Sequence, residues 1–273
     1  MKMQIDKERF GPWALITGAS SGIGREFARQ VTGSGIHVVL VARRENLLED
    51  LGRELTNDFH VRYRLVTADL SLGDSMEGLV ERTKDLDIGL VVSNAGTGNP
   101  GEFLKIELQT LETLLRLNTL AHLQIAHFFG RKLAQRRQGG LLLVGAMGAE
   151  TGVPCMANDG AAKAYVHSLG EGLHVELKPL GISVTVLAPG ITDTPVLAKF
   201  GFNPRTMPMK PMNADQCVTE GLRALQENRS MIIPGKMNRL MSATIPVSFK
   251  RNVTAKTFAK VLANSRSTVC RSC

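Results

Sequence analysis

The chain has few cysteines and few tyrosines: its 273 residues include four Cys, two Tyr and one Trp. No stretch approaches the roughly 18 apolar residues that a membrane-spanning helix requires. The charged segment MKMQIDKERF at residues 1–10 lacks the apolar core of a signal peptide. Because the cysteines also lack the spacing of a disulfide framework, the sequence predicts a cytoplasmic protein. The six scattered histidines have no metal-like partners, so no metal site is expected.

Acidic residues are missing from the C-terminal part of the chain. None follows Glu227, whereas nine basic residues do. The net charge of +8 therefore belongs to this segment, because the rest has 24 basic and 25 acidic residues. We predict a domain over residues 1–235 and a basic, helical extension over 236–273. The extension could contact an anionic membrane surface, another subunit or an acidic partner, or it could be a solvated helix. Nucleic-acid binding is not expected, because no recognition motif or stacking aromatics accompany the charge.

Short apolar runs alternate with segments of helical spacing along the whole chain. The runs predict strands at 13–16, 38–42, 63–68, 88–93, 141–144, 184–187 and 231–233. The spacing predicts helices at 25–31, 45–55, 75–84, 108–136 and 158–178, with the fourth bent or broken inside. Nearly continuous apolar strands separated by helices indicate a parallel sheet covered on both faces. The expected fold is α/β, a single doubly wound domain.

A glycine-rich turn, TGASSGIG at residues 17–24, lies between the first strand and the first helix. Glycines allow a tight turn, and a helix N-terminus offers unpaired N–H groups to a phosphate. The turn could also be a plain connector. Its candidate ligand-binding residues are Gly18, Ser20, Ser21, Gly22, Ile23 and Gly24.

Other distinctive residues follow the remaining strands. They are Arg43, Asp69, Asn94-Ala95-Gly96, Gly145-Ala146 and Pro189-Gly190. Ligands of parallel sheets bind outside the carboxyl ends of the strands. We therefore expect these positions to converge on one binding cleft.

The order and spacing of several motifs resemble the short-chain dehydrogenase/reductase family. These motifs are TGASSGIG, Asp69, Asn94-Ala95-Gly96, Asn118, Lys163 and the stretch from Pro189-Gly190 to Thr194. The resemblance covers about residues 10 to 235. It implies a Rossmann fold, a nicotinamide cofactor, a small-molecule substrate and a homodimer or homotetramer. It places Asp69 and Leu70 at the adenine, and Asn94, Ala95 and Gly96 in the cofactor cleft. It further places Pro189, Gly190, Thr192 and Thr194 beside the nicotinamide, and assigns catalytic positions to Asn118 and Lys163.

The residues after the second strand bear on the choice of cofactor. A site that prefers NAD offers a carboxylate to the ribose 2′-hydroxyl. Here Arg43 and Arg44 stand instead, and a guanidinium can bond two phosphate oxygens at once. The sequence thus favours NADP(H), although both arginines could simply face solvent.

Two family positions are changed. The family's proton-donating tyrosine corresponds to Asp159, four residues before Lys163, and its serine corresponds to Ala146. Asp159 and Lys163 share a helix face, so an ion pair and a lowered Asp159 pKa are expected. Such an anion could not protonate an alkoxide, unless apolar surroundings raised its pKa and made it a general base. Tyr165 lies on another face and is expected to be a packing residue.

Three hypotheses follow for the function. The first is hydride transfer to or from a small apolar substrate, such as a conjugated C=C bond or a ketone, with Asn118, Asp159 and Lys163 as catalytic residues. Met207, Met209 and Met212, in the segment that covers substrate in the family, favour an apolar substrate. The second is a non-redox isomerase, lyase or cyclase. The third is a catalytically silent NADP(H)-binding module. A laboratory substitution is also possible, because alanine is the residue that an experimenter would choose to replace the family's serine at position 146.

Overall fold

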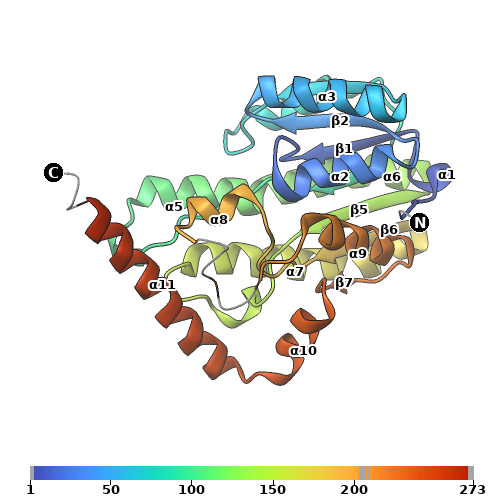
Figure 1. Cartoon of the computed structure of the whole chain (residues 1–273). Coiled ribbons are helices and arrows are strands. Elements are labelled where there is room, and N and C mark those ends of the chain that lie inside the picture. The colour runs from blue at the N-terminus through green and yellow to red at the C-terminus, as the bar shows by residue number, and fades with distance from the viewer. Residues whose placement is uncertain (1–2, 203–206, 208–209, 270–273) are drawn as a thin grey trace.

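A seven-stranded parallel sheet forms the centre of the molecule (Figure 1). The computed structural model describes residues 3–202, 207 and 210–269. The strands lie in the order β3-β2-β1-β4-β5-β6-β7, and every neighbouring pair is parallel. Their bounds are β1 (Trp13–Thr17), β2 (His37–Ala42), β3 (Tyr63–Thr67), β4 (Ile88–Ser93), β5 (Gly139–Val144), β6 (Ile182–Leu187) and β7 (Met231–Ile232). The prediction of a doubly wound α/β fold is confirmed, with all seven strands where the apolar runs indicated.

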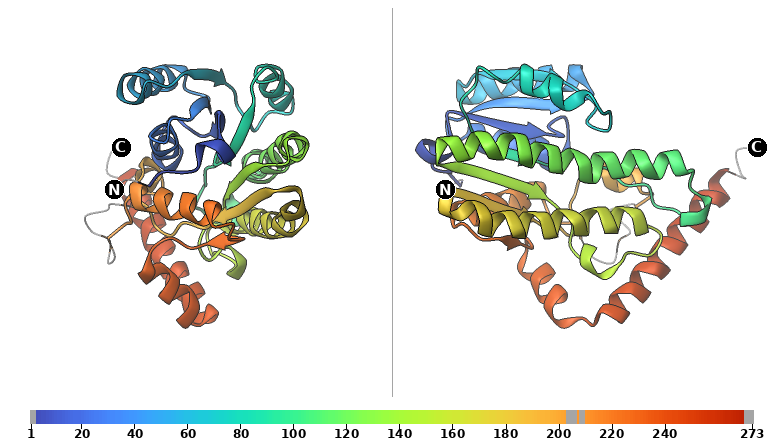
Figure 2. Two further views of the ribbon diagram at one scale, coloured as in Figure 1. Left: turned by 90° about the vertical axis from the view of Figure 1, so that its right-hand side faces the viewer. Right: turned by 180° about the vertical axis from the view of Figure 1, so that it is seen from behind.

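Helices cover both faces of the sheet (Figure 2). Their bounds are α1 (Lys7–Phe10), α2 (Gly22–Thr32), α3 (Glu45–Phe59), α4 (Ser75–Glu81), α5 (Leu108–Leu115), α6 (Ala121–Arg136), α7 (Ala157–Leu177), α8 (Pro195–Lys199), α9 (Ala214–Gln226), α10 (Lys236–Thr244) and α11 (Val247–Val269). Helices α2, α3 and α9 pack on one face of the sheet, and α4, α6 and α7 pack on the other. Successive strand residues point to opposite faces, so Ile16 belongs to the first core and Leu15 to the second.

The long helix expected over residues 108–136 is interrupted as predicted. A π-helical turn at Arg116–Leu120 separates α5 from α6. Such turns are rare and occur often at functional sites. This one contains Asn118, whose side chain is buried. Helix α9 was not anticipated, although its buried positions Cys217, Val218, Leu222 and Leu225 are apolar.

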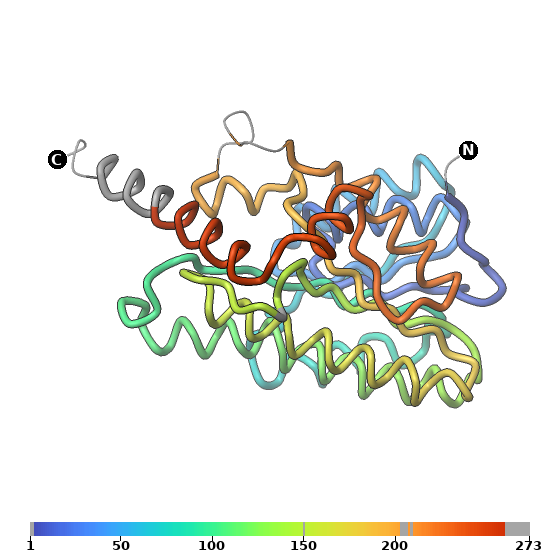
Figure 3. The backbone as a smooth tube through the Cα atoms, turned by 90° about the horizontal axis from the view of Figure 1, so that it is seen from below, coloured from blue at the N-terminus to red at the C-terminus, as the bar shows by residue number. Residues whose placement is uncertain are grey.

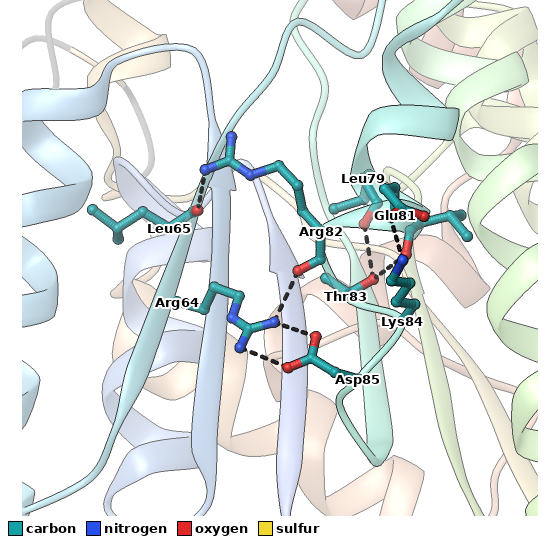
Figure 4. Close-up of polar contacts among 9 residues, drawn as sticks. Arg64, Leu65, Leu79, Glu81, Arg82, Thr83, Lys84 and Asp85 are labelled. Carbon is teal, nitrogen blue, oxygen red and sulfur yellow. Dashed lines mark hydrogen bonds and ion pairs between the residues drawn. The ribbon is translucent and has the colours of Figure 1, made fainter.

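Hydrogen bonds and an ion pair fix strand β3 against the end of α4 (Figure 4). Arg64 Nη1 and Nη2 donate to Asp85 Oδ1 and Oδ2 at 2.5 and 2.9 Å, and Arg64 Nη1 also reaches the Arg82 carbonyl at 3.0 Å. Arg82 in turn donates to the Leu65 carbonyl at 3.2 Å. These contacts hold the outermost strand, so Asp69 just beyond it keeps a defined position.

Helices α10 and α11 leave the body after β7 and extend beyond the sheet (Figures 1 and 2). The rings of Phe258 on α11 and Phe202 meet edge to face at 5.4 Å, and Arg251 Nε donates to the Thr151 carbonyl. In the part of the chain that the structure describes, no helix is long and apolar enough to cross a membrane. Nor do the described residues include a group of three or more His, Cys, Asp or Glu able to hold a metal ion.

Candidate active site

The glycine-rich turn between β1 and α2 needs glycine for two reasons, a positive φ angle and a close approach of the backbone. Gly18 and Gly22 have φ angles of 66° and 56°, which L side chains rarely adopt. Gly24 packs so closely that a Cβ there would lie 2.2 Å from the Gly18 carbonyl oxygen. The turn therefore brings its backbone and the N-terminus of α2 to the carboxyl end of the sheet, where a phosphate could bind.

Thr17 ties this turn to the end of β4. Its Oγ1 accepts hydrogen bonds from the N–H groups of Asn94 and Ala95, both at 2.9 Å. Asn94 Nδ2 donates to the Thr17 carbonyl, also at 2.9 Å. Thr17 is not among the site residues expected from the sequence, although a threonine that ends an apolar strand was a usable signal.

Arg44 bends over the turn, whereas Arg43 extends toward solvent. Arg44 Nη2 donates to Ser20 Oγ at 2.8 Å and to Ser21 Oγ at 3.0 Å. Arg43 Nη1 lies 3.4 Å from Asp69 Oδ2. Asp69 is otherwise held by the N–H and hydroxyl groups of Ser71, and Leu70 beside it is buried. The two guanidiniums thus flank the outer end of the cleft.

The loop after β6 forms the opposite wall. Pro189 accepts a hydrogen bond from the Met147 N–H at 2.9 Å, and Thr192 Oγ1 donates to the Gly190 carbonyl at 3.0 Å. A Cβ on Gly22 would lie 3.1 Å from Cγ2 of Thr194, so this loop stands directly against the glycine turn. The glycine cradle and the helix N-terminus together fit the phosphates of a dinucleotide, and the arginine pair lies beside them.

Asp159, one of the two family positions expected to be changed, is buried, with 7% of the residue exposed. Oδ2 accepts the Asn99 N–H at 3.2 Å, and Oδ1 accepts a hydrogen bond from Asn118 Nδ2 at 3.4 Å. Asn118 is itself fixed, because Nδ2 donates to the Thr97 carbonyl at 2.7 Å and Oδ1 accepts the Thr97 N–H at 3.1 Å. The π-helical turn therefore places an amide against the carboxyl group.

The ion pair and the lowered pKa expected for Asp159 are not found in the structure. Burial raises the pKa of Asp159, and this outweighs the lowering by the Asn99 N–H and by the nearby charges of Lys163 and Lys199. Although both side chains are described, Asp159 and Lys163 form no direct ion pair; Lys163 Nζ instead donates to the Val144 carbonyl at 2.8 Å. The sequence indicated adjacency on the helix but not the desolvation, which depends on the neighbouring elements.

Lys163 packs against Gly96, the last residue of the Asn94-Ala95-Gly96 segment. A Cβ on Gly96 would lie 3.2 Å from Lys163 Nζ and 2.8 Å from Asn118 Oδ1. Burial lowers the pKa of Lys163 to about 8, against the opposing effect of the Asp159 carboxylate. The three residues expected to be catalytic, Asn118, Asp159 and Lys163, thus lie together.

Two histidines and one lysine surround this group and were not assigned a role from the sequence. His167 Nε2 accepts the Ala146 N–H at 3.2 Å, one turn of α7 after Lys163. His122 Nδ1 lies 2.8 Å from Ser93 Oγ, and burial lowers its pKa well below the ordinary value. Lys199, at the end of α8, donates to Thr97 Oγ1 at 2.5 Å. His122 is buried, and Lys199 carried no recognisable sequence signal.

A small hollow opens beside Asp159. It is lined mainly by apolar groups: Gly101, Phe103, Ile106, Leu111, Cys155, Met156, Ala157, with Asn99 and Asn158. Tyr165 is 39% exposed on α7, so it is a surface residue rather than the expected packing residue. Met212 packs against the core, and Met209 lies outside the described residues. The apolar lining beside the carboxyl group therefore comes from other residues than the methionines singled out in the sequence.

Comparison with known proteins gives consistent matches. A family model described as short chain dehydrogenase matches residues 12–203. A 7beta-hydroxysteroid dehydrogenase of Clostridium sardiniense is 28% identical over 233 residues, which cover 85% of this chain and 89% of that protein. A very-long-chain 3-oxoacyl-CoA reductase of Neurospora crassa is 33% identical over 189 residues, 67% of this chain and 57% of that protein.

Solved structures agree with this assignment. A structure of a 7beta-hydroxysteroid dehydrogenase superposes with a TM-score of 0.83 at 25% identity, covering 94% of this chain and 100% of that one. A short-chain dehydrogenase from Sphingobium yanoikuyae in complex with NADPH superposes with a TM-score of 0.76 at 27% identity, covering 96% of each chain. Its fold, its family match and its relatives agree: this chain belongs to the short-chain dehydrogenase family, a family of oxidoreductases that use nicotinamide cofactors.

Proposed function

We propose that the protein is an NADP(H)-dependent oxidoreductase in which Asp159 performs the proton transfer that a tyrosine performs elsewhere in the family. The observation that supports it most is the burial of this carboxyl group between Asn99 and Asn118, which raises its pKa. A carboxyl group with a raised pKa can hold a proton nearer to neutral pH and donate it. Asp159 also borders the small hollow, whose lining is mainly apolar.

Each residue around Asp159 has a separate role in the proposed reaction. When bound, the nicotinamide cofactor supplies or accepts the hydride. Asp159 gives its proton to the substrate, and the resulting carboxylate is stabilised by the Asn99 N–H and the Asn118 amide. Lys163, held by the Val144 carbonyl, and Lys199 add positive charge near that carboxylate.

Ala146 affects which substrate is turned over. It offers no hydroxyl to a carbonyl oxygen, and losing one such donor typically costs about 10²–10³ in rate. A conjugated C=C bond is therefore a better acceptor than a simple ketone, because its proton goes to carbon. The apolar lining beside Asp159 supports an apolar substrate, as do relatives named for hydroxysteroids and very-long-chain 3-oxoacyl-CoA.

A catalytically silent NADP(H)-binding module is the second candidate. The simultaneous absence of the serine and tyrosine hydroxyls, at Ala146 and Asp159, favours it. NADPH absorbance with α,β-unsaturated ketones and simple ketones distinguishes the two. Consumption of NADPH supports the oxidoreductase, whereas tight NADPH binding without turnover of any compound contradicts it and supports the silent module.

Replacing both cleft arginines tests the cofactor. We expect Arg43→Ala with Arg44→Ala to weaken NADPH binding about 10- to 100-fold, because each charged hydrogen bond to the 2′-phosphate contributes about 1.5–3 kcal/mol before solvent exposure reduces it. NADH binding should stay nearly unchanged. Fluorescence titration measures both affinities, and Arg53→Ala, an exposed arginine of α3, is the matched control. Equal losses for NADPH and NADH would contradict the assignment of the arginines to the 2′-phosphate.

The homodimer or homotetramer implied by the family remains part of the proposal. Exposed apolar side chains on α5 and α6, including Leu108, Leu115 and Leu123, support association through these helices. Sedimentation velocity of the whole chain measures the assembly, and a monomer at all concentrations would contradict it.

A further inference from the structure

The helices α10 and α11, called the tail helices below, expose large apolar side chains. Met237 and Leu240 on α10 and Val247, Phe249 and Val253 on α11 are between 42% and 61% exposed. No side chain of α10 is buried. A single exposed apolar residue is ordinary, but a cluster of them within residues 237–253 marks a surface that contacts something apolar.

Most of the positive charge of the same helices is uncompensated. Arg239 on α10 pairs with Glu220, and Arg229, which precedes β7, pairs with Glu227. Beyond Arg239 the chain has no acidic residue. Within the described part of the tail helices, Lys236, Lys250, Arg251 and Lys256 form no ion pair. The apolar cluster therefore lies in a field of one sign.

Apolar and basic side chains share the outward face of α11. Phe249, Val253 and Lys256 are spaced at i, i+4 and i+7, which places them on one face, and all three are exposed. The opposite face is turned to the body, since Phe258 packs on Phe202 and Arg251 reaches the Thr151 carbonyl. Figure 3 shows the coloured part of α11 running along the molecule.

We propose that the outward face of the tail helices docks on a lipid surface that contains anionic headgroups. Helices that combine exposed apolar side chains with lysine and arginine lie in the interface of anionic bilayers. A second copy of the chain fits less well, because two uncompensated basic tails repel each other. Nucleic acid fits less well too, because Phe249 is the one exposed aromatic side chain in the described tail.

The position of the tail gives this docking a consequence. Helices α8 and α11 lie at the end of the molecule toward which the strands point (Figure 1). That end carries the cofactor cleft and the hollow beside Asp159. Docking brings the opening of the cleft close to the lipid surface, a consequence that rests on the proposed function, whereas the docking itself does not.

Vesicle sedimentation of the full chain tests the proposal without any turnover. We expect the protein to sediment with vesicles of phosphatidylcholine and phosphatidylglycerol, and to stay in solution with phosphatidylcholine alone. Binding should weaken as salt is raised, because screening reduces the attraction between lysines and headgroups.

Two variants and two matched controls locate the surface. Phe249→Ser with Val253→Ser should weaken vesicle binding at least tenfold, because two apolar anchors are lost. Lys256→Glu should also weaken it at least tenfold, since each charge near the surface contributes about fivefold. Val175→Ser, 70% exposed on α7, makes one apolar-to-polar change elsewhere, and Arg131→Glu, exposed on α6, makes one charge reversal elsewhere. Both controls should bind like the unmodified chain.

Three results would contradict the docking of the tail helices on an anionic lipid surface. The proposal is wrong if the unmodified chain ignores anionic vesicles, or if the tail variants bind as well as their controls while keeping the same melting temperature. It is also wrong if Phe249→Ser with Val253→Ser changes only the sedimentation coefficient of the free protein, which identifies a second copy as the occupant. NADPH titration of the same samples separates this outcome from any failure of the proposed activity.

Discussion

The double variant Ala146→Ser, Asp159→Tyr is expected to reduce simple ketones with NADPH at least 100-fold faster than the unmodified chain. The serine restores a hydrogen-bond donor to the carbonyl oxygen, which typically contributes about 10²–10³ in rate. The tyrosine supplies a neutral proton donor beside Lys163, because a phenol has a pKa near about 10. NADPH absorbance with a panel of ketones measures the gain.

Each single variant is a control for the pair. Ala146→Ser alone tests the oxygen-stabilising donor, and Asp159→Tyr alone tests the proton donor. A double variant that folds and binds NADPH but reduces no ketone would show that residues 146 and 159 have been matched to the wrong family positions. The proposed cleft would then need another alignment.

Asp159→Asn is expected to lower the turnover of the unmodified protein's substrate about 10²–10⁴-fold, the usual contribution of a general acid or base. The amide keeps the size of the side chain and can accept one of the two hydrogen bonds, from the Asn99 N–H or from Asn118 Nδ2, but it has no transferable proton. NADPH affinity should change little, so steady-state kinetics with separate cofactor titration measures the effect. Asp58→Asn, an exposed carboxylate of α3, is the matched control. A variant with full activity would remove Asp159 from the reaction.

The pH profile gives an independent test of the same residue. The reduction needs the protonated carboxyl group, so its rate should fall as pH rises through the raised pKa of Asp159. Stability follows the same direction: the folded state holds this proton more tightly than the unfolded chain, so the contribution is present below the ordinary pKa of 3.8 and is lost as pH rises through the folded value. Denaturant unfolding of Asp159→Asn should lack this component of the pH dependence.

The strands and most helices could be read from the sequence, because each depends on local periodicity. A parallel sheet buried on both faces needs apolar residues at every strand position, as in Val38 to Val41, and such runs are visible without coordinates. Helix α8 was not anticipated because its five residues are too short to show a period. The interruption near Asn118 was expected, but its π-helical form was not.

The candidate site was predictable where a motif fixes the backbone. Gly18, Gly22 and Gly24 could be assigned because the motif needs a tight turn without side chains; Gly18 and Gly24 pack against Asn94, and Gly22 packs against Thr194. Asn99, Thr97 and Lys199 could not, since they approach Asp159 only after loops from separate parts of the chain have packed together. No spacing in the sequence relates these residues to one another.

The sequence by itself determined the parallel sheet, the family, the glycine turn and the arginine pair, and it led to the proposal that Ala146 and Asp159 replace two catalytic hydroxyls. Only the tertiary structure decided whether the pKa of Asp159 is raised or lowered. Neighbours in a helix can be counted along the chain, and from them Lys163 was expected to pair with Asp159 and lower its pKa. Desolvation is the sum over all elements that exclude water from a group, and at Asp159 that sum outweighs the nearby positive charges.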